Sequence, residues 1–314
     1  MSRLPFVKVQ GLGNDFVVVD LRPGHPAAEA RPSPLDPAVA RALCSRNFGV
    51  GADGVLAILP GSEGDVRMRV INADGSEAEM CGNGIRCVAR VLWESDPSLR
   101  RPVLRIDTGA GLLECAVQAA DDRVESVAVE MGRPRLRRGE IPMGGPSAER
   151  AIRSPMRVKD RSVSLTAVSM GNPHAVIFVD DENADLLSLA RQLGPAIEVD
   201  PLFPQRTNVE LARVQPDGSG IDLVVWERGC GITMACGTGA CATVVAACLE
   251  GRAQPGREIP VRLPGGSLHI TVPPLPGEGR EPSYGSVRMR GPAERVFESY
   301  VDTARVLETA SGRI

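Results

Sequence analysis

Residues 81–84 read Cys-Gly-Asn-Gly, and residues 236–239 read Cys-Gly-Thr-Gly. A single glycine turn of this kind at the start of a helix is common and carries little weight alone. Here two copies stand 155 residues apart in a chain of 314 residues, counted from Cys81 to Cys236. A repeat at this distance indicates that the chain consists of two copies of one structural unit.

The similarity between the halves extends upstream of the two turns. Residues 13–16, Gly-Asn-Asp-Phe, precede an apolar run, and so do residues 171–174, Gly-Asn-Pro-His. At the offset of the two cysteines, further residues align: Phe48 with Phe203, Asp53 with Asn208, and Asn72 with Glu227. The duplication is therefore not confined to the glycine turns.

Each turn is flanked by the same predicted elements. Apolar residues alternate over 66–70 and over 221–225, which predicts a strand before each turn. After the turns, residues 85–92 show helical spacing, and residues 240–249 are apolar on nearly every side. The pattern predicts an α+β fold with two pseudo-symmetric domains, each a mostly antiparallel sheet or barrel wrapped around a central helix.

The domain boundaries follow from the repeat. The alternating segment 287–290 is expected to return to the first half, so the first domain comprises 1–130 with 287–314, and the second comprises 131–286. Proline- and glycine-rich stretches near 21–37, 139–147 and 273–283 are expected to form surface loops.

The composition favours a small-molecule ligand. The formal net charge is -3 and only 3% of residues are aromatic, so neither a basic field nor base stacking predicts nucleic-acid binding. The N-terminus lacks the pattern of a secretion signal, and no apolar run reaches the ~18 residues that span a bilayer. We expect a soluble cytoplasmic protein with no membrane or nucleic-acid partner.

The cysteines fall into two groups. The chain has eight of them, which we expect to stay reduced in the cytoplasm. Cys81 and Cys236 begin the repeated turns, and Cys230 is expected to be a packing residue. The other five stand among apolar neighbours and are expected to be small buried hydrophobes: Cys44, Cys87, Cys115, Cys241 and Cys248.

The duplicated cysteines suggest a specific chemistry. At a helix start, unpaired backbone N–H groups and the helix dipole favour a thiolate, and the same amides can hold a carboxylate. Two such turns brought to one cleft by pseudo-twofold symmetry would place a thiol on each side of a substrate. One thiolate could then remove a proton from a carbon while the opposite thiol returns one, which inverts that centre without a cofactor.

Three other uses of these residues are less consistent with the sequence. A zinc site would need Cys-x2-Cys pairs or histidines at ligand spacing, so no metal is expected. A cysteine nucleophile activated by His174 would leave the duplication without a purpose. Pyridoxal phosphate needs a Schiff-base lysine, and neither Lys8 nor Lys159 lies in a glycine-rich phosphate motif, so we expect no cofactor.

Seven blocks resemble the diaminopimelate epimerases, which convert LL-diaminopimelate to the meso isomer in lysine and peptidoglycan synthesis. The resemblance spans nearly the whole chain, and the order of the blocks makes it highly specific. The blocks are Gly11–Phe16, Asn72–Ser76, Cys81–Cys87, Gly171–His174, Thr207–Glu210, Glu227–Gly229 and Ala235–Gly239.

The resemblance implies a role for each matching residue. Cys81 and Cys236 match the two catalytic thiols of the family, and His174, with Glu227, matches residues beside them. The family also implies a homodimer. Four residues match the pocket of the α-carboxylate: Gly82, Asn83, Gly237 and Thr238. Six residues match the other polar contacts to the substrate: Asn14, Asn72, Asn172, Asn208, Glu227 and Arg228.

One position departs from the family pattern. Many members carry a glutamine that lines the pocket where this chain has Gly54, and we interpret the preceding Asp53 as a loop residue only. Two alternatives stay open: a cofactor-independent racemase of proline, hydroxyproline or histidine, and a thiol redox or metal-binding protein. Arg228 and Glu227 favour a substrate with a second amino-acid head, because they could bind a distal carboxylate and ammonium.

Overall fold

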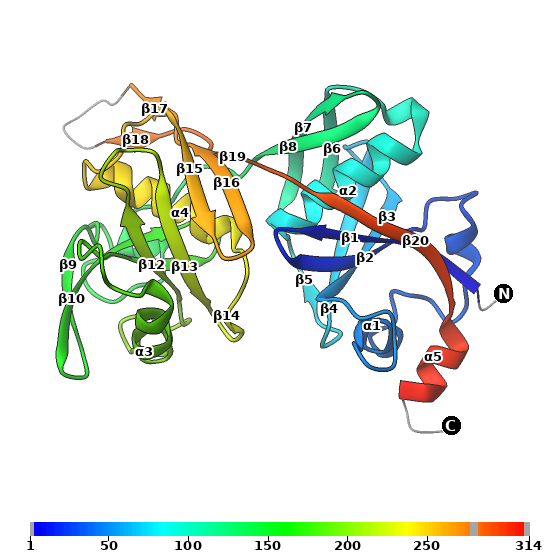
Figure 1. Ribbon diagram of the computed structural model, residues 1–314, viewed down its shortest axis with the longest axis horizontal. Helices are drawn as coiled ribbons and strands as arrows, with labels where there is room; N and C mark the ends of the chain where they lie inside the picture. The colour runs from blue at the N-terminus through cyan, green and yellow to red at the C-terminus, as the bar shows by residue number, and fades with distance from the viewer. Residues whose placement is uncertain (1–2, 277–281, 311–314) are drawn as a thin grey trace. The chain divides into compact units, whose positions relative to one another are not determined.

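The chain forms two compact units, each built from strands and helices (Figure 1). The computed structural model describes residues 3–276 and 282–310. Unit 1 is Met1–Val129 with Gly291–Ile314, and unit 2 is Glu130–Arg290. The chain therefore passes between the units twice, and unit 1 is built from both ends of the sequence.

Unit 1 is a largely antiparallel sheet in the order β20-β1-β2-β3-β4-β6-β7-β8. Among the strand pairs described for this unit, β2–β3 and β4–β6 are parallel. The strands are β1 (Arg3–Gly11), β2 (Asn14–Asp20), β3 (Gly54–Pro60), β4 (Val66–Asn72), β5 (Glu77–Ala78), β6 (Val103–Thr108), β7 (Gly111–Ala120), β8 (Arg123–Glu130) and β20 (Glu294–Asp302). The helices are α1 (Pro37–Cys44), α2 (Gly82–Ser95), α5 (Thr303–Ala310) and the short η1 (Pro26–Glu29) and η2 (Pro97–Leu99).

Unit 2 has the order β9-β10-β11-β12-β13-β15-β16-β19. The strands are β9 (Ser154–Val158), β10 (Arg161–Ser169), β11 (Pro173–Phe178), β12 (Asn208–Val214), β13 (Ile221–Glu227), β14 (Gly231–Ile232), β15 (Glu258–Leu263), β16 (Gly266–Thr271) and β19 (Arg288–Gly291), with the small hairpin β17 (Pro274–Leu275) and β18 (Ser283–Tyr284). The helices are α3 (Leu186–Glu198), α4 (Gly237–Leu249) and η3 (Arg138–Glu140).

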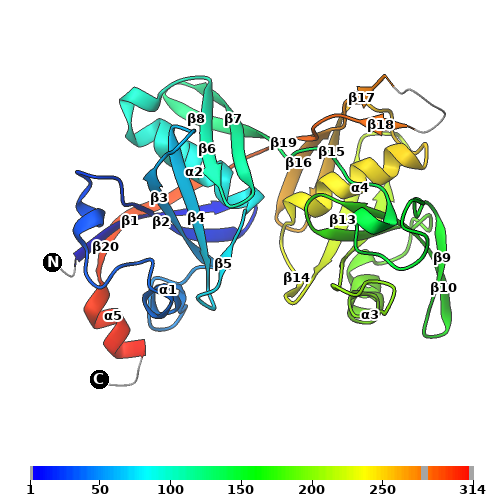
Figure 2. The same cartoon turned by 180° about the vertical axis from the view of Figure 1, so that it is seen from behind.

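The pairing pattern confirms the duplication and the α+β fold class. In unit 1, successive pairs along β1-β2-β3-β4-β6-β7 run antiparallel, parallel, antiparallel, parallel and antiparallel. In unit 2, β10-β11-β12-β13-β15-β16 repeat the same series. Helix α2 packs on β1, β7 and β20, and α4 packs on β10, β11, β12 and β16 (Figure 2). The strands predicted at 66–70 and 221–225 are β4 and β13.

The register corrects one alignment of the repeat. Phe16 pairs with Gly54, and its counterpart His174 pairs with Asn208. Gly54, and not Asp53, therefore occupies in unit 1 the place that Asn208 occupies in unit 2. The constant offset fails here because the connection from β12 to β13 is one residue longer than that from β3 to β4.

The two helices that follow the glycine turns are both buried, but they differ in the residues that they bury. Helix α4 is apolar all round, and its residues are buried from Gly239 to Cys248, as predicted. Helix α2 carries a wholly buried Arg86, which donates to Gly82 O at 3.0 Å, to Asn83 Oδ1 at 3.0 Å and to Pro292 O at 3.2 Å. These acceptors compensate for the desolvation of its charge, so Arg86 joins the first turn of α2 to the chain entering β20.

The cysteines and loops follow the sequence predictions except at Cys230 and within 273–283. All eight cysteines lie in the described part of the chain and none is in a disulfide. The five apolar-flanked cysteines are buried as expected, but Cys230 is exposed, because it lies in the turn between β13 and β14. Of the expected loops, 273–283 contains β17 and β18, and its residues 277–281 lie outside the described residues. No helix among the described residues is long and apolar enough to span a membrane.

Candidate active site

Cys81 is the N-cap residue of α2. Its backbone is extended (φ −137°, ψ 113°), and its sulfur accepts the backbone N–H of Gly84 at 3.3 Å. The thiol donates towards Asn14 Oδ1 at 3.9 Å, and Asn83 Nδ2 donates to the same oxygen at 3.3 Å. Three of the predicted site residues, Asn14, Cys81 and Asn83, are thus brought together by the first turn of α2 and the start of β2.

Asp53 is not merely a loop residue, contrary to our interpretation of the sequence. One carboxylate oxygen accepts Asn14 Nδ2 at 2.7 Å and the Asp15 N–H at 3.1 Å, and the other accepts Arg46 Nη2 at 2.8 Å. This contact fixes the Asn14 amide so that its oxygen faces Cys81. The sequence alone could not show it, because Arg46, Asp53 and Asn14 meet only in the folded unit.

The other two positions of unit 1 contribute less to this cluster. Asn72, at the end of β4, donates through Nδ2 to Ser76 Oγ at 3.0 Å within its own turn. Gly54 has no room for a side chain in its present position, since a Cβ there would lie 2.8 Å from Ile71 O. Close packing of β3 on β4 therefore accounts for glycine at this departure from the family pattern.

Cys236 is the N-cap residue of α4, in the same geometry as Cys81. Its φ and ψ are −119° and 111°, its sulfur accepts the N–H of Gly239 at 3.4 Å, and Thr238 Oγ1 lies 3.5 Å away. The side chain differs in being buried, with 6% of the residue exposed.

The protonation of Cys236 corrects our expectation of a favoured thiolate. Burial raises the pKa of Cys236 well above its usual range, and the negative charge of Glu227 raises it further. The hydrogen bonds from Thr238 and from the Gly239 amide lower the pKa, but they do not outweigh burial. The resting form of Cys236 is therefore the thiol, because the depth of the site opposes the helix N-terminus.

Glu227 lies against this thiol at the end of β13. Its carboxylate accepts hydrogen bonds from Thr233 Oγ1 and from the thiol of Cys236. Burial raises the pKa of Glu227, so its carboxyl group holds a proton more readily than an exposed glutamate. Glu227 is therefore suited to exchange a proton with Cys236.

A second buried carboxyl group, Glu210, was not among the residues predicted from the sequence. It lies on β12, and its Oε1 is 2.6 Å from His174 Nδ1, while His174 Nε2 is 2.9 Å from Asn172 Oδ1. Asn172 Nδ2 in turn donates to Thr238 Oγ1 at 3.4 Å. Both His174 and Glu210 are wholly buried, and burial raises the pKa of Glu210. The only sequence signal was its place in the block Thr207–Glu210.

Asn208 and Arg228 form a separate part of unit 2. Asn208 Oδ1 accepts the backbone N–H of Arg228 at 2.9 Å, and the Arg228 guanidinium donates to Gln205 O at 3.0 Å. The carboxylate of Glu198, at the end of α3, accepts the Gly229 N–H at 2.9 Å and the Trp226 indole N–H at 2.8 Å. These bonds hold the turn that carries Arg228.

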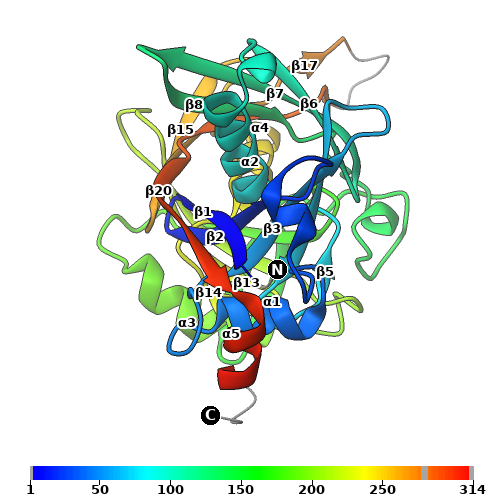
Figure 3. The ribbon, with the colours of Figure 1, turned by 90° about the vertical axis from the view of Figure 1, so that its right-hand side faces the viewer.

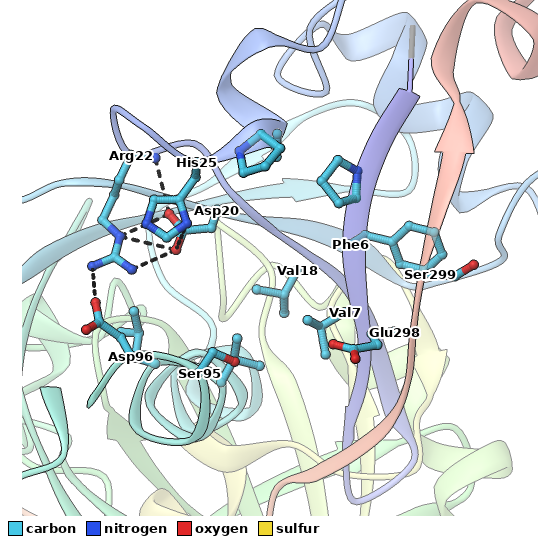
Figure 4. A pocket seen from close by; sticks show the side chains of 15 residues that line it. Phe6, Val7, Val18, Asp20, Arg22, His25, Ser95, Asp96, Glu298 and Ser299 are labelled. Carbon is cyan, nitrogen blue, oxygen red and sulfur yellow. Dashed lines mark hydrogen bonds and ion pairs between the residues drawn. The ribbon is translucent and has the colours of Figure 1, made fainter. Parts of the chain in front are cut away.

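A cavity of about 400 Å³ in unit 1 contains none of these residues (Figure 4). It lies at the C-terminal end of α2, away from Cys81 at the N-terminal end of that helix. Its polar wall is an ion-pair cluster in which Arg22 bridges Asp20 at 2.7 Å and Asp96 at 3.0 Å. The charges of this cluster compensate one another, and no cysteine is among the described residues that line the cavity.

The described residues also contain no group of three or more His, Cys, Asp or Glu side chains placed to hold a metal ion. The polar groups around Cys81 in unit 1 and those around Cys236 in unit 2 are called the two half-sites. Within each half-site these groups are bonded to one another, to backbone atoms and to the helix start.

Known proteins resemble this chain over most of its length. A family model for diaminopimelate epimerase matches residues 6–137 and 166–296. The diaminopimelate epimerase of Pelotomaculum thermopropionicum is 47% identical over 93% of this chain and 96% of its own. That of Synechococcus sp. (strain JA-3-3Ab) is 48% identical over 94% and 97%. A solved hydroxyproline epimerase from Agrobacterium vitis has a TM-score of 0.67 at 18% identity, over 96% of this chain and 92% of that one, which shows a shared fold.

Proposed function

The chain belongs to the diaminopimelate epimerase family, and from that membership we propose that Cys81 and Cys236 are the acid and base of its reaction. It is an isomerase that interconverts LL- and meso-diaminopimelate, a step in lysine and peptidoglycan synthesis. The observation that carries the proposal is that both cysteines cap a helix at equivalent places in a duplicated fold.

The two thiols are proposed to act on opposite faces of one α-carbon. The thiolate of one cysteine takes the α-proton as the Cα–H bond breaks, and the thiol of the other delivers its proton to the opposite face. The two cysteines thus exchange protonation states in each turnover, and the centre is inverted. Backbone N–H groups at the starts of α2 and α4 would hold the α-carboxylate and stabilise the charge that develops on it.

Protonation of Cys236 is proposed to depend on Glu227. The thiol donates to this carboxylate at rest, so proton transfer to Glu227 would generate the thiolate without a solvent base. The raised pKa of Glu227 makes that transfer less unfavourable than transfer to an exposed carboxylate. The contacts of Glu227 therefore support a role at the reacting thiol.

The distal amino-acid head is proposed to bind near Arg228. A guanidinium offers two parallel donors to a carboxylate, and the bonds from Asn208 and Glu198 support the turn that presents it. Asn14, Asn72 and Asn172 would complete the polar lining, since an amide can both donate and accept.

An exchange assay in heavy water tests the function. Pure protein incubated with LL-diaminopimelate should yield the meso isomer with deuterium at the inverted α-carbon, detected by mass spectrometry and chiral chromatography. L-proline and L-histidine serve as comparison substrates, because neither carries a second amino-acid head. Exchange of either with none of diaminopimelate would contradict the proposal and favour a different racemase.

We further propose that the enzyme is a cytoplasmic homodimer that associates through β20. This strand exposes three large apolar side chains, Val296, Phe297 and Tyr300, at 55%, 45% and 56%. Large apolar side chains left exposed on one strand favour a protein interface, and eight cysteines that form no disulfide suit a reducing compartment. Light scattering should give twice the chain mass of 33.3 kDa, and Phe297→Glu should lower it. A monomeric wild-type protein would refute this assembly.

A further inference from the structure

The two half-sites differ at two positions that the repeat makes equivalent. Phe16 in unit 1 stands where unit 2 has His174, and both residues pair with the first residue of the third strand of their repeat. By the same register, Leu56 stands where unit 2 has Glu210. The glycines agree with this assignment, since a Cβ on Gly84 would meet the Leu56 side chain and one on Gly239 would meet Glu210 Oε1, each at 3.0 Å. Unit 2 thus replaces an apolar pair by a bonded acid and imidazole.

This polar pair begins a chain of hydrogen bonds that ends on a catalytic sulfur. Glu210 Oε1 is 2.6 Å from His174 Nδ1, and His174 Nε2 is 2.9 Å from Asn172 Oδ1. Asn172 Nδ2 reaches Thr238 Oγ1 at 3.4 Å, and Thr238 Oγ1 reaches Cys236 Sγ at 3.5 Å.

The Asn172 amide determines which atom donates in each hydrogen bond of this series. Because its oxygen faces His174, the Nε2 atom of the ring must carry the hydrogen between them. Because its nitrogen donates to Thr238, the hydroxyl oxygen acts as an acceptor there, and its own hydrogen is free to point at Cys236. A donor aimed at sulfur stabilises the thiolate.

Unit 1 has the opposite arrangement. There Asp53 accepts the amide nitrogen of Asn14, so the amide oxygen faces Cys81 and accepts from its S–H group. An acceptor beside the sulfur stabilises the thiol. The duplicated asparagines therefore present opposite ends to the two cysteines.

We propose that Glu210 is a positioning residue for Cys236. Glu210 holds His174 so that Asn172 and Thr238 direct a hydroxyl hydrogen onto the catalytic sulfur. This inference rests on the proposed function. Its consequence is that the half-sites are not interchangeable: unit 2 is adjusted to give up the thiol proton and unit 1 to keep it. Cys236 needs this support because burial and the negative charges of both Glu227 on β13 and Glu210 itself oppose its thiolate.

The replacement Glu210→Gln tests the proposal with little change in volume. The backbone N–H of Ala175 donates to the Glu210 carboxylate, so the glutamine should keep its carbonyl, and not its NH2 group, at this place. That carbonyl would accept from His174 Nδ1–H, which leaves Nε2 without a hydrogen and reverses the Asn172 amide and the Thr238 hydroxyl. The change also removes the charge of Glu210, which by itself would lower the pKa of Cys236. We expect the loss of the hydroxyl donor to outweigh this effect, so the acid limb of kcat/KM should move up by about one pH unit. The shift is expected only in the reaction direction in which Cys236 removes the proton, because Cys81 is the base in the other.

A threonine series keeps the test decisive if Glu210→Gln folds poorly. Thr238→Val removes the last donor and should shift the same limb, whereas Thr238→Ser should restore it. The double variant Glu210→Gln/Thr238→Val should shift it no further than either single change, since both act through one chain. Thr243→Val is the matched control, because this hydroxyl on α4 donates to Gly239 O at 2.7 Å and not to sulfur.

The pH dependence of alkylation separates this inference from the proposed function. The rate at the Cys236 peptide, followed by mass spectrometry, should report a pKa about one unit higher in Glu210→Gln, while that of Cys81 stays constant. An unchanged Cys236 profile, or equal shifts in both reaction directions, would overturn the role of Glu210. If the wild-type protein did not epimerise diaminopimelate but the Cys236 pKa still shifted in Glu210→Gln, only the proposed function would be contradicted.

Discussion

Replacing Cys236 by alanine is expected to lower the turnover of LL- and meso-diaminopimelate alike by about 10³-fold. A positioned acid or base contributes typically 10²–10⁴-fold, and each direction of a two-base reaction needs both thiols. The loss should appear in kcat from initial rates, because the starts of α2 and α4 that would hold the carboxylate remain. Deuterium exchange in heavy water should fall together with turnover.

The exposed Cys230 provides the control for that experiment. It lies in the turn between β13 and β14, six positions before Cys236, and the proposed mechanism does not use it. Cys230→Ala should therefore retain wild-type kcat. A Cys236→Ala enzyme that kept more than about a tenth of its turnover would contradict the acid–base role, since water would then replace the thiol too easily.

Arg228→Ala should lower kcat/KM for diaminopimelate by about 10²-fold, mainly through KM. Two charge-assisted hydrogen bonds to the distal carboxylate would be lost, at about 1.5–3 kcal/mol for each such bond before water compensates. Because the distal head does not react, removing its contacts weakens the ground state and the transition state together. Steady-state kinetics in both directions measures the split between KM and kcat.

Arg206→Ala separates this effect from a general loss of positive charge. Arg206 is an exposed arginine of the same region, 3.6 Å from Glu198, and it is not among the proposed substrate contacts. It should leave KM near the wild-type value. An equal rise in KM for both variants would indicate an effect of the local field and would remove the specific role of Arg228.

The sequence predicted the duplicated fold and its helix starts well. Both depend on local patterns: a cysteine with two glycines, alternation in β4 and β13, and an apolar run in α4. Such patterns determine how a segment folds before it meets the rest of the chain. The family resemblance named the reaction, which neither periodicity nor spacing could do.

Features that depend on distant partners were missed. Asp53 was interpreted as a loop residue because its contacts, Asn14 and Arg46, lie 39 and 7 positions away. Glu210 stands within a strand buried on both faces, and only the parallel pairing with β11 brings His174 to it. The expectation of a thiolate at Cys236 was wrong for a related reason: the helix start can be recognised in the sequence, but the depth of burial cannot.

The passage of the chain from unit 1 to unit 2 and back sets an order for synthesis. Strand β1 emerges from the ribosome first, yet its neighbour β20 is translated only after the whole of unit 2 (Figure 3). The backbone oxygen of Pro292 that receives Arg86 arrives equally late. During translation unit 2 can therefore assemble while unit 1 still lacks its outer strand, and unit 1 is complete only after β20 has been made.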